Sequence, residues 1–314
     1  MLKYSLKRLA QSMVTLFLVV TVVFLLMRLL PVEGYFGARY DKLSPEQQEA
    51  ILDKMGLLDP WYQQVGTFYT KLAQGDLGTS TVYRVDVPVT EIIGPRIPYS
   101  VSFGLVATAV SLLLGLAMGV HMARHKGRFW DRTWTTYVVF INAVPLAVYL
   151  LFVQLYASDL LKLPILFDKH EPKSWLLPAV SMSLGSIAGY AIWMRRYMVD
   201  ELNKDYIKLA RAKGMSSSAI MVKHVMRNAY VPMAQYLPAA ILATISGSIY
   251  VESLYSIPGM GGLLVDAITR QDNPLVQALV LIFSSVGIVG LFLGDVLMAM
   301  VDPRIKHDKG EGAR

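Results

Sequence analysis

The sequence predicts an all-α membrane protein with six transmembrane helices, and its composition and apolar stretches carry that prediction. The chain has 314 residues, of which 54% are hydrophobic and 17% are charged, and its mean hydropathy is +0.44. Such a chain is too apolar for an ordinary soluble domain. A membrane-spanning helix needs about 20 consecutive, mostly apolar residues. Six stretches meet this requirement, at residues 9–30, 101–123, 137–157, 175–194, 233–255 and 275–301.

The basic residues predict the orientation of these spans. The net charge of +7 would suit a nucleic-acid partner if it were gathered on one soluble face, but it lies in short segments beside the apolar stretches. Alternate connecting segments are rich in Lys and Arg, at residues 3–8, 124–132, 195–227 and 304–314. Because cytoplasmic loops carry the excess of Lys and Arg, we expect both termini to be cytoplasmic, and we expect no nucleic-acid partner.

Residues 1–30 comprise the N-terminal tail and the first span. The apolar stretch is longer than that of a cleavable signal peptide, and it ends at Arg28 and Pro31 without a small-residue cleavage site. We therefore expect this span to be retained as a membrane anchor.

Residues 31–98 form the longest polar segment and are expected on the external side. Ser44, Pro45 and Gln47 make a capping-box pattern that predicts a helix ending near Gly56. A second helix is expected between Pro60 and Gly75, with these apolar residues on one side: Trp61, Val65, Phe68, Tyr69 and Leu72. Both helices are expected to pack against the membrane domain, and docking of an external partner is the alternative.

Residues 99–301 carry the other five spans. Small residues four apart, which let helices approach closely in lipid, occur at 115 and 119, at 185 and 189, and at 290 and 294. Pro145 in the third span and Pro178 in the fourth are expected to kink their helices and free backbone carbonyls.

Polar residues inside the spans are the candidates for a pathway or a gate. Ionisable side chains are costly in a bilayer and are therefore functional candidates. Glu252 lies near the outer end of the fifth span, and Asp295 lies in the sixth, where we expect it to bond a neighbouring helix. The uncharged polar residues either line an aqueous path or cross-link helices, and the sequence favours neither: Asn142, Gln154, Ser181, Ser183 and Ser246. Our pathway or gate candidates are Asn142, Gln154, Ser246 and Glu252.

A short external hairpin is expected between the fifth and sixth spans. Pro258 and Gly259 predict its turn, with Gly261 close behind, and the residues that follow have helical composition. After the sixth span, residues 302–314 are expected to form a charged, disordered cytoplasmic tail.

The cytoplasmic loop 200–232 contains a basic, amphipathic segment, which begins at Asp205. Gly214 suits the position after a helix C-terminus, and the hydroxyls of Ser216 to Ser218 suit the start of another helix. The pattern predicts two short helices that meet at a sharp turn.

Several kinds of chemistry are missing from the sequence. It contains no Walker-type GxxxxGK[ST] motif, no G-x-S-x-G elbow and no cysteine. Its five histidines do not have metal-ligand spacing. We expect no catalysis, no metal and no cofactor in this chain itself.

Segments 205–208 (DYIK), 210–214 (ARAKG) and 227–229 (RNA) resemble the coupling-helix loop of bacterial ABC importer permeases, above all in the dipeptide and oligopeptide branch. Further matches extend over nearly the whole chain, at 28–31 (RLLP), 75–80 (GDLGTS), 88–91 (PVTE), 177–179 (LPA), 256–261 (SIPGMG), 274–277 (PLVQ) and 302–304 (DPR). The long external segment is similar to that of the first, or B-type, permease subunit. Two segments depart from the pattern: KLA at 208–210, where the wider superfamily has Glu-Ala-Ala, and PVEG at 31–34, where family members often have Pro-Gly-Asp-Pro.

The resemblance implies a type I importer in the bacterial inner membrane. Its expected partners are the lipid bilayer, a paralogous permease subunit, two ATPase subunits that bind ATP and Mg, an extracytoplasmic peptide-binding protein and a peptide substrate. It also implies which residues couple to the ATPase: Asp205, Tyr206, Ala210, Arg211, Ala212, Lys213, Gly214 and Met215.

Other functions stay open at this point. Within the same importer class, the solute could be nickel, glutathione or a sugar oligomer, although the spans hold no histidine cluster that would favour nickel. An ion-coupled secondary transporter would carry midplane ionisable sites and an internal repeat. A membrane scaffold without transport activity is the remaining alternative.

Overall fold

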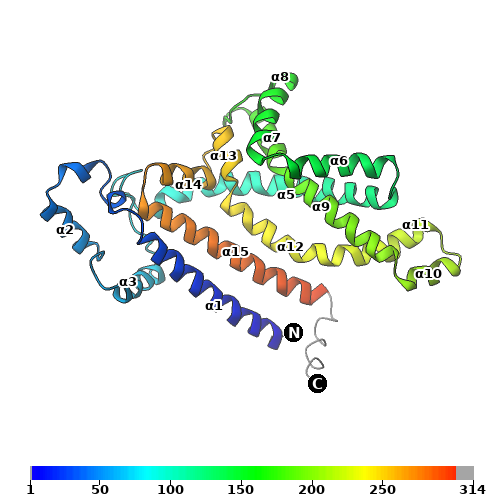
Figure 1. Cartoon of the computed structure of the whole chain (residues 1–314), viewed down its shortest axis with the longest axis horizontal. Coiled ribbons are helices and arrows are strands. Elements are labelled where there is room, and N and C mark those ends of the chain that lie inside the picture. The colour runs from blue at the N-terminus through cyan, green and yellow to red at the C-terminus, as the bar shows by residue number, and fades with distance from the viewer. Residues whose placement is uncertain (1, 302–314) are drawn as a thin grey trace.

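The structure is a computed structural model that describes residues 2–301, so the predicted tail 302–314 lies outside the described residues. Within 2–301 the regular elements are helices, apart from an isolated β-bridge between Thr79 and Pro88 (Figure 1). The α-helices are α1 (Leu2–Met27), α2 (Pro45–Lys54), α3 (Trp61–Ala73), α4 (Val89–Ile93), α5 (Ile97–Arg124), α6 (Phe129–Ala143), α7 (Leu146–Phe152), α8 (Ser158–Leu161), α9 (Leu176–Leu202), α10 (Asp205–Ala212), α11 (Ser217–Ile220), α12 (Arg227–Ser246), α13 (Ile249–Tyr255), α14 (Met260–Thr269) and α15 (Asn273–Val301).

Four segments are long and apolar enough to cross a membrane: Ser5–Met27, Val89–Arg124, Pro172–Leu202 and Asn273–Met298. They contain α1, α5, α9 and α15, which correspond to the first, second, fourth and sixth predicted spans. Two bent helix pairs occupy the places of the third and fifth spans. The described residues therefore hold four candidate spans, or six if each bent pair crosses once.

The third predicted span, which was expected to be kinked at Pro145, is broken there into two helical segments. Its place is taken by α6 and the helical segment from Leu146 to Leu161, which are bent by 114°. Val144 adopts extended backbone angles (φ −86°, ψ 132°), and Pro145 caps α7. A proline disfavours helical angles in the residue before it, so the predicted local kink is a complete break.

The other predicted proline kink is absent. Pro178 lies in the first turn of α9, which runs unbroken from Leu176 to Leu202. The first backbone N–H groups of a helix have no partner within it, so a proline there removes no hydrogen bond. In the fifth span the direction changes by 40° between α12 and α13, next to Gly247, whose φ is +67°.

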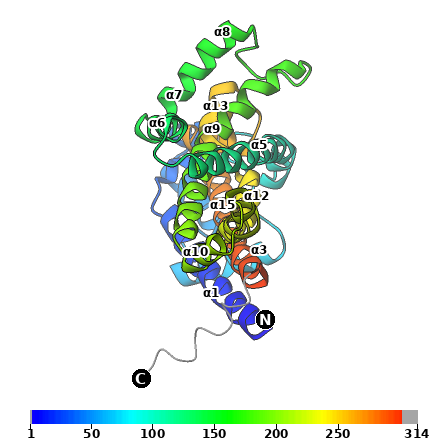
Figure 2. The same ribbon diagram turned by 90° about the vertical axis from the view of Figure 1, so that its right-hand side faces the viewer.

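The long helices pack side by side in the order α1, α15, α12, α5, α9 and α6 (Figures 1 and 2). Glycines allow the closest approaches. A Cβ atom on Gly119 of α5 would lie 2.6 Å from the Ala191 carbonyl oxygen of α9, and one on Gly294 would lie 2.5 Å from the Gln235 carbonyl oxygen. A Cβ on Gly189 would meet nothing within 4 Å. The packing prediction is thus confirmed for the first and third glycine pairs, and wrong for Gly189.

An ion pair joins the N-terminal half of α1 to α15. Arg8 Nη1 lies 3.2 Å from Asp295 Oδ2, and Gln235 Nε2 of α12 donates to Asp295 Oδ1 at 3.4 Å. The expectation that Asp295 bonds a neighbouring helix is confirmed.

The polar segment after α1 contains both expected helices. Ser44 and Gln47 form the capping box of α2, and Gly56 follows the helix with a φ of +69°. α3 packs against α1, where the rings of Tyr69 and Phe17 stack with their centroids 5.1 Å apart. Packing against the membrane domain is therefore confirmed for α3.

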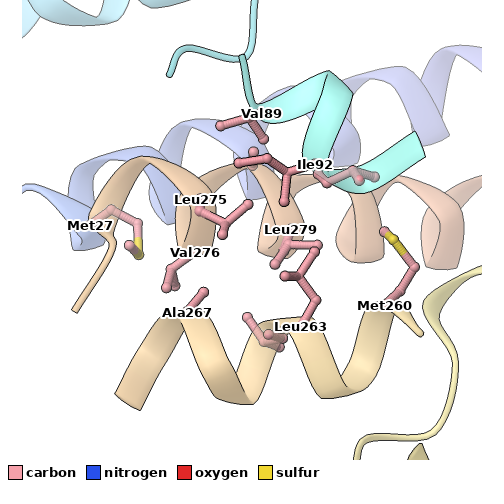
Figure 3. Close-up of a cluster of buried hydrophobic side chains, with 12 residues drawn as sticks. Met27, Val89, Ile92, Met260, Leu263, Ala267, Leu275, Val276 and Leu279 are labelled. Atoms are coloured by element: carbon pink, nitrogen blue, oxygen red, sulfur yellow. The ribbon is translucent and has the colours of Figure 1, made fainter. Parts of the chain in front are cut away.

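A hydrophobic core joins α14 to α15 and to the short helix α4. Met260, Leu263 and Ala267 of α14 face Leu275 and Leu279 of α15, with Val89 and Ile92 of α4 above them (Figure 3). All of these side chains are buried. The hairpin after the fifth span is therefore held by the ends of its neighbouring helices.

Candidate functional site

The loop between α9 and α12 folds into two short helices, as expected. α10 ends in a Schellman-type turn, in which Gly214 N donates to the Arg211 oxygen at 2.9 Å and Met215 N donates to the Ala210 oxygen at 3.2 Å. Gly214 has a φ of +77°, a conformation that costs other residues energy. The Ser216 hydroxyl caps α11 by accepting from Ala219 N at 3.3 Å.

One face of α10 packs on the membrane domain. Ile207 and Ala210 lie three residues apart, so they share a helix face, and they are 0% and 7% exposed. They belong to a core with Met194 and Met198 of α9, and Met215 packs against the same core. Ala210 was expected to couple to an ATPase, but its side chain points into this chain.

The opposite face of α10 is open. Most of the predicted coupling residues are exposed there or in the turn that follows: Asp205, Tyr206, Arg211, Ala212, Lys213 and Gly214. Leu209 is 57% exposed, and the sequence interpretation did not single it out. The sequence does contain a pattern that identifies Leu209 as outward-facing. Ile207 and Ala210 mark the buried side of the helix, and a residue two places after Ile207 lies on the opposite side.

Tyr206 links α10 to the two long helices on either side of it. Its hydroxyl donates to Glu201 at the end of α9, and Asn228 Nδ2 at the start of α12 donates to the same hydroxyl at 2.9 Å and to Glu201 Oε1 at 3.0 Å. Partial burial, and then the bond to the Glu201 carboxylate, raise the pKa of Tyr206 to about 12. These bonds restrict rotation of α10 relative to α9 and α12.

A second link lies two turns before the end of α9. Arg195 Nε and Nη2 donate to the two oxygens of Asp131 in α6, at 2.6 Å and 2.8 Å, and Gly127 N donates to Asp131 Oδ2 at 2.8 Å. Asp131 is 3% exposed, so this bidentate pair is largely shielded from water. The sequence pattern did not reveal it, because the partners are far apart in the chain.

Glu252 lies at the opposite end of the long helices and is 0% exposed. Its Oε1 accepts from the Ser100 hydroxyl of α5 at 2.8 Å, and its Oε2 accepts from the backbone N–H groups of Gly261 at 2.7 Å and Gly262 at 3.0 Å. A Cβ on Gly259 would lie 2.3 Å from Glu252 Cδ. The expected Pro258–Gly259 turn is confirmed, and it closes directly over this carboxylate.

The other pathway candidates do not share one environment. Gln154 is 4% exposed, and its Nε2 donates to the carbonyls of Ile165 and Leu254 at 3.1 Å and 2.9 Å. Asn142 is exposed and donates to Val138 in its own helix at 2.7 Å. Ser246 is half-buried at the end of α12. Gln154 is therefore a cross-link to α13, which also carries Glu252.

Asp272 was missed in the sequence and lies at the start of α15, 0% exposed. Its carboxylate accepts from the Ser80 hydroxyl at 2.5 Å, from Val82 N at 3.0 Å and from Tyr83 N at 2.8 Å. Leu275 N also donates to this carboxylate, at 3.2 Å, so Asp272 connects two of the segments that carry the family resemblance, residues 75–80 and 274–277. The sequence pattern that could have identified it is an Asp immediately before a helix that begins with Asn-Pro, because Asp is a preferred helix N-cap residue.

No group of three or more His, Cys, Asp or Glu side chains within residues 2–301 is arranged to hold a metal ion.

The chain is similar to a known protein family and to several characterised permeases. The family described as binding-protein-dependent transport system inner membrane component matches residues 111–307. The chain is 32% identical over 306 residues to the dipeptide transport system permease protein DppB of Lactococcus lactis subsp. cremoris, an alignment that covers 98% of this chain and 100% of that protein. It is 33% identical over 309 residues to the oligopeptide transport system permease protein OppB of Haemophilus influenzae, with the same coverage. The oligopeptide transport system permease protein AppB of Bacillus subtilis is 31% identical over 320 residues and is covered equally.

A solved structure shares the fold. The crystal structure of an amino acid ABC transporter with histidines aligns with a TM-score of 0.52 and 16% identity, over 68% of this chain and 94% of the other. On the family match and the full-length relatives, the chain belongs to the inner-membrane components of binding-protein-dependent transport systems.

Proposed function

We propose that this chain is a permease subunit of an ATP-driven peptide importer and forms half of the pathway for di- and oligopeptides. The full-length relatives are dipeptide and oligopeptide transport system permeases, which supports a peptide substrate. The open face of α10, held by buried contacts on its other side, is the observation that carries the coupling role. A helix that is rigidly packed on one face and exposed on the other can transmit a partner's movement to the spans.

In this proposal the two bent pairs each cross the membrane once, giving six spans of the type I importer fold with both termini in the cytoplasm. α10 then lies on the cytoplasmic side, and the hairpin of α13 and α14 lies outside. ATP and Mg are bound by two partner ATPase subunits, a paralogous permease completes the pathway, and an external binding protein delivers the peptide.

The coupling and gate residues have distinct roles in the proposal. Leu209 and the exposed residues around it contact the ATPase, whereas Ala210 and Tyr206 hold α10 at its angle to α9. Glu252 and Gln154 are buried and bonded, so they support a gate at α13 without lining it. Asn142 and Ser246 remain available to line the pathway.

A leucine exchange tests the coupling face. Burying a leucine in an interface contributes about 1.5–3 kcal/mol, so Leu209→Ser should weaken ATPase binding by roughly tenfold or more. We expect less ATPase to co-purify with the variant and less labelled tripeptide to enter cells. Leu160→Ser is the matched control, because Leu160 is 81% exposed but lies in α8, far along the chain from α10.

If the amount of ATPase that co-purifies with Leu209→Ser is unchanged, α10 does not form part of the ATPase interface. The substrate is tested separately, by mass spectrometry of what the co-purifying binding protein carries. A metal ion or a sugar there, with no peptide, would contradict the peptide assignment and leave the coupling role intact.

A further inference from the structure

The two charged residues that flank the apolar part of α1 indicate where this helix enters and leaves the hydrocarbon core of the membrane. Arg8 and Arg28 lie twenty residues apart with no charged residue between them. At a rise of about 1.5 Å per residue this separation is about 30 Å, the thickness of the hydrocarbon core. Phe17 and Thr21 therefore lie near the middle of the bilayer, and Phe24 lies about 6 Å inside the boundary at Arg28.

α3 contacts α1 at these depths and not beyond its end. The Tyr69 hydroxyl donates to the Phe17 carbonyl oxygen at 3.0 Å and lies 2.7 Å from Thr21 Oγ1. One residue earlier, Phe68 stacks on Phe24 with ring centroids 4.5 Å apart. Figure 1 shows α3 beside the C-terminal half of α1, while α2 lies farther out.

The exposed surface of α3 carries little charge. It is formed by Trp61, Tyr62, Gln63, Gly66, Thr67, Thr70, Lys71 and Ala73, of which only Lys71 is charged. α2 has similar length but exposes Glu46, Glu49, Asp53 and Lys54. Trp and Tyr are enriched where helices meet the membrane–water interface, and Trp61 and Tyr62 are 66% and 58% exposed.

Polar groups gather behind α3 at the level of Arg28. A cavity of about 210 Å³ lies between α1, α3 and α15. Its lining mixes charged residues, among them Arg28, Lys71, Asp59 and Asp76, with apolar ones such as Phe24 and Leu281. Within residues 2–301, Arg28 Nε and Gln64 Oε1 are buried and have no hydrogen-bond partner.

We propose that α3 is embedded in the lipid leaflet at the C-terminal end of α1, with phospholipid acyl chains covering its exposed face and headgroups at the level of Arg28 and Lys71. The segment predicted to be external is then divided: α2 is in water, and α3 is in the membrane. The long side chain of Lys71 extends its ammonium group to the headgroups. The Tyr69 hydroxyl has both of its hydrogen-bond partners, Phe17 and Thr21, in α1, as a polar group at this depth requires.

Spin labels on single cysteines test this placement, since the chain contains no cysteine of its own. The assembled complex, reconstituted in phosphatidylcholine vesicles, carries a nitroxide at Gly66→Cys, where a Cβ meets nothing within 4 Å. Leu18→Cys on α1 and Glu49→Cys on α2 are the lipid and water standards, at positions that are both exposed. Collision rates with oxygen, which dissolves in lipid, and with a water-soluble nickel chelate are measured at each site.

We expect the label at 66 to match the label at 18, with an oxygen-to-nickel ratio severalfold above that at 49. A ratio like that at 49 would place α3 in water and overturn the proposal. Low collision rates with both reagents would mean that another protein chain covers α3, which would also overturn it. Thr70→Cys gives an independent reading if the Gly66 variant does not assemble.

Discussion

At the scale of single residues, Tyr206 shows how a surface side chain sets the position of a whole helix. Its hydroxyl bonds Glu201 and Asn228, which belong to α9 and α12. Because the bonds converge on one phenol, its loss removes both of these side-chain links from α10. The residue is also 38% exposed, so it contributes to the outer face as well as to the support.

Titration of this phenol checks the network. The pKa of Tyr206 is raised from 10.0 to about 12, so the folded protein favours the protonated phenol. The stabilisation is complete below pH 10 and is lost as the pH rises through about 12. Tyrosinate absorbance of the wild type minus that of Tyr206→Phe should therefore show one phenol with a midpoint near 12.

Glu201→Gln is the control for the cause of that shift. Removing the carboxylate charge should lower the midpoint, because the bond to Glu201 raises the pKa of Tyr206. A wild-type midpoint at the ordinary value would contradict the hydrogen-bond network.

At the scale of elements, glycines that look alike in sequence have opposite roles. Gly119 lies against α9, where a Cβ would be 2.6 Å from Met194 Cβ, whereas Gly189 faces open space. Only the tertiary contact separates them, since both lie inside long helices and in the same small-residue spacing.

Alanine exchanges should therefore have opposite signs. Gly119→Ala should destabilise by about 1–3 kcal/mol through overpacking, and Gly189→Ala should stabilise by up to about 1 kcal/mol because alanine is the better helix former. Thermal unfolding of the two variants in the same detergent measures the difference. Equal shifts would contradict the close approach of α5 and α9.

The turn after α10 makes a separate prediction. Gly214 has a φ of +77° and nothing within 4 Å of a Cβ, so a side chain there meets backbone strain of about 1–2 kcal/mol and no steric block. Gly214→Val should reduce peptide uptake while leaving the amount of membrane protein unchanged. Gly214→Asn, which tolerates this conformation, should retain most uptake, and normal uptake in the valine variant would refute the coupling role.

At the scale of the whole molecule, the candidate residues lie at two opposite ends of the long helices. α10 and the Asp131–Arg195 pair lie at one end of α9, and the Glu252 network lies near the other end of the long helices (Figure 1). α5, α9 and α12 run between these ends as packed rods. The proposed coupling route from α10 to α13 therefore runs along these packed helices.

The topology itself is testable with an impermeant thiol reagent. Glu49→Cys on α2 and Ser217→Cys at the start of α11 are both exposed positions. In whole cells only the cysteine at 49 should be labelled, and after permeabilisation both should be. Labelling of both in intact cells would show that the proposed orientation is wrong.

Local sequence patterns predicted those features of the fold that depend only on residues close together in the chain. The capping box of α2, the turn at Gly214 and the apolar lengths of α1, α5, α9 and α15 follow from propensities within a few residues. Asp295 could be predicted to bond another helix because an isolated charge in a span needs a partner. Local patterns are therefore enough to place the candidate site on α10.

The sequence by itself determined that the chain is a multi-span membrane protein with a capped, basic helix pair between two spans, because hydrophobic length and capping act locally. Only the tertiary structure decided that Ala210 faces inward and Leu209 outward, that Asp131 pairs with Arg195, that Asp272 bonds Ser80, and that α3 lies beside the C-terminal half of α1. These facts depend on which helix faces which, and that is set by the packing of surfaces far apart in the chain.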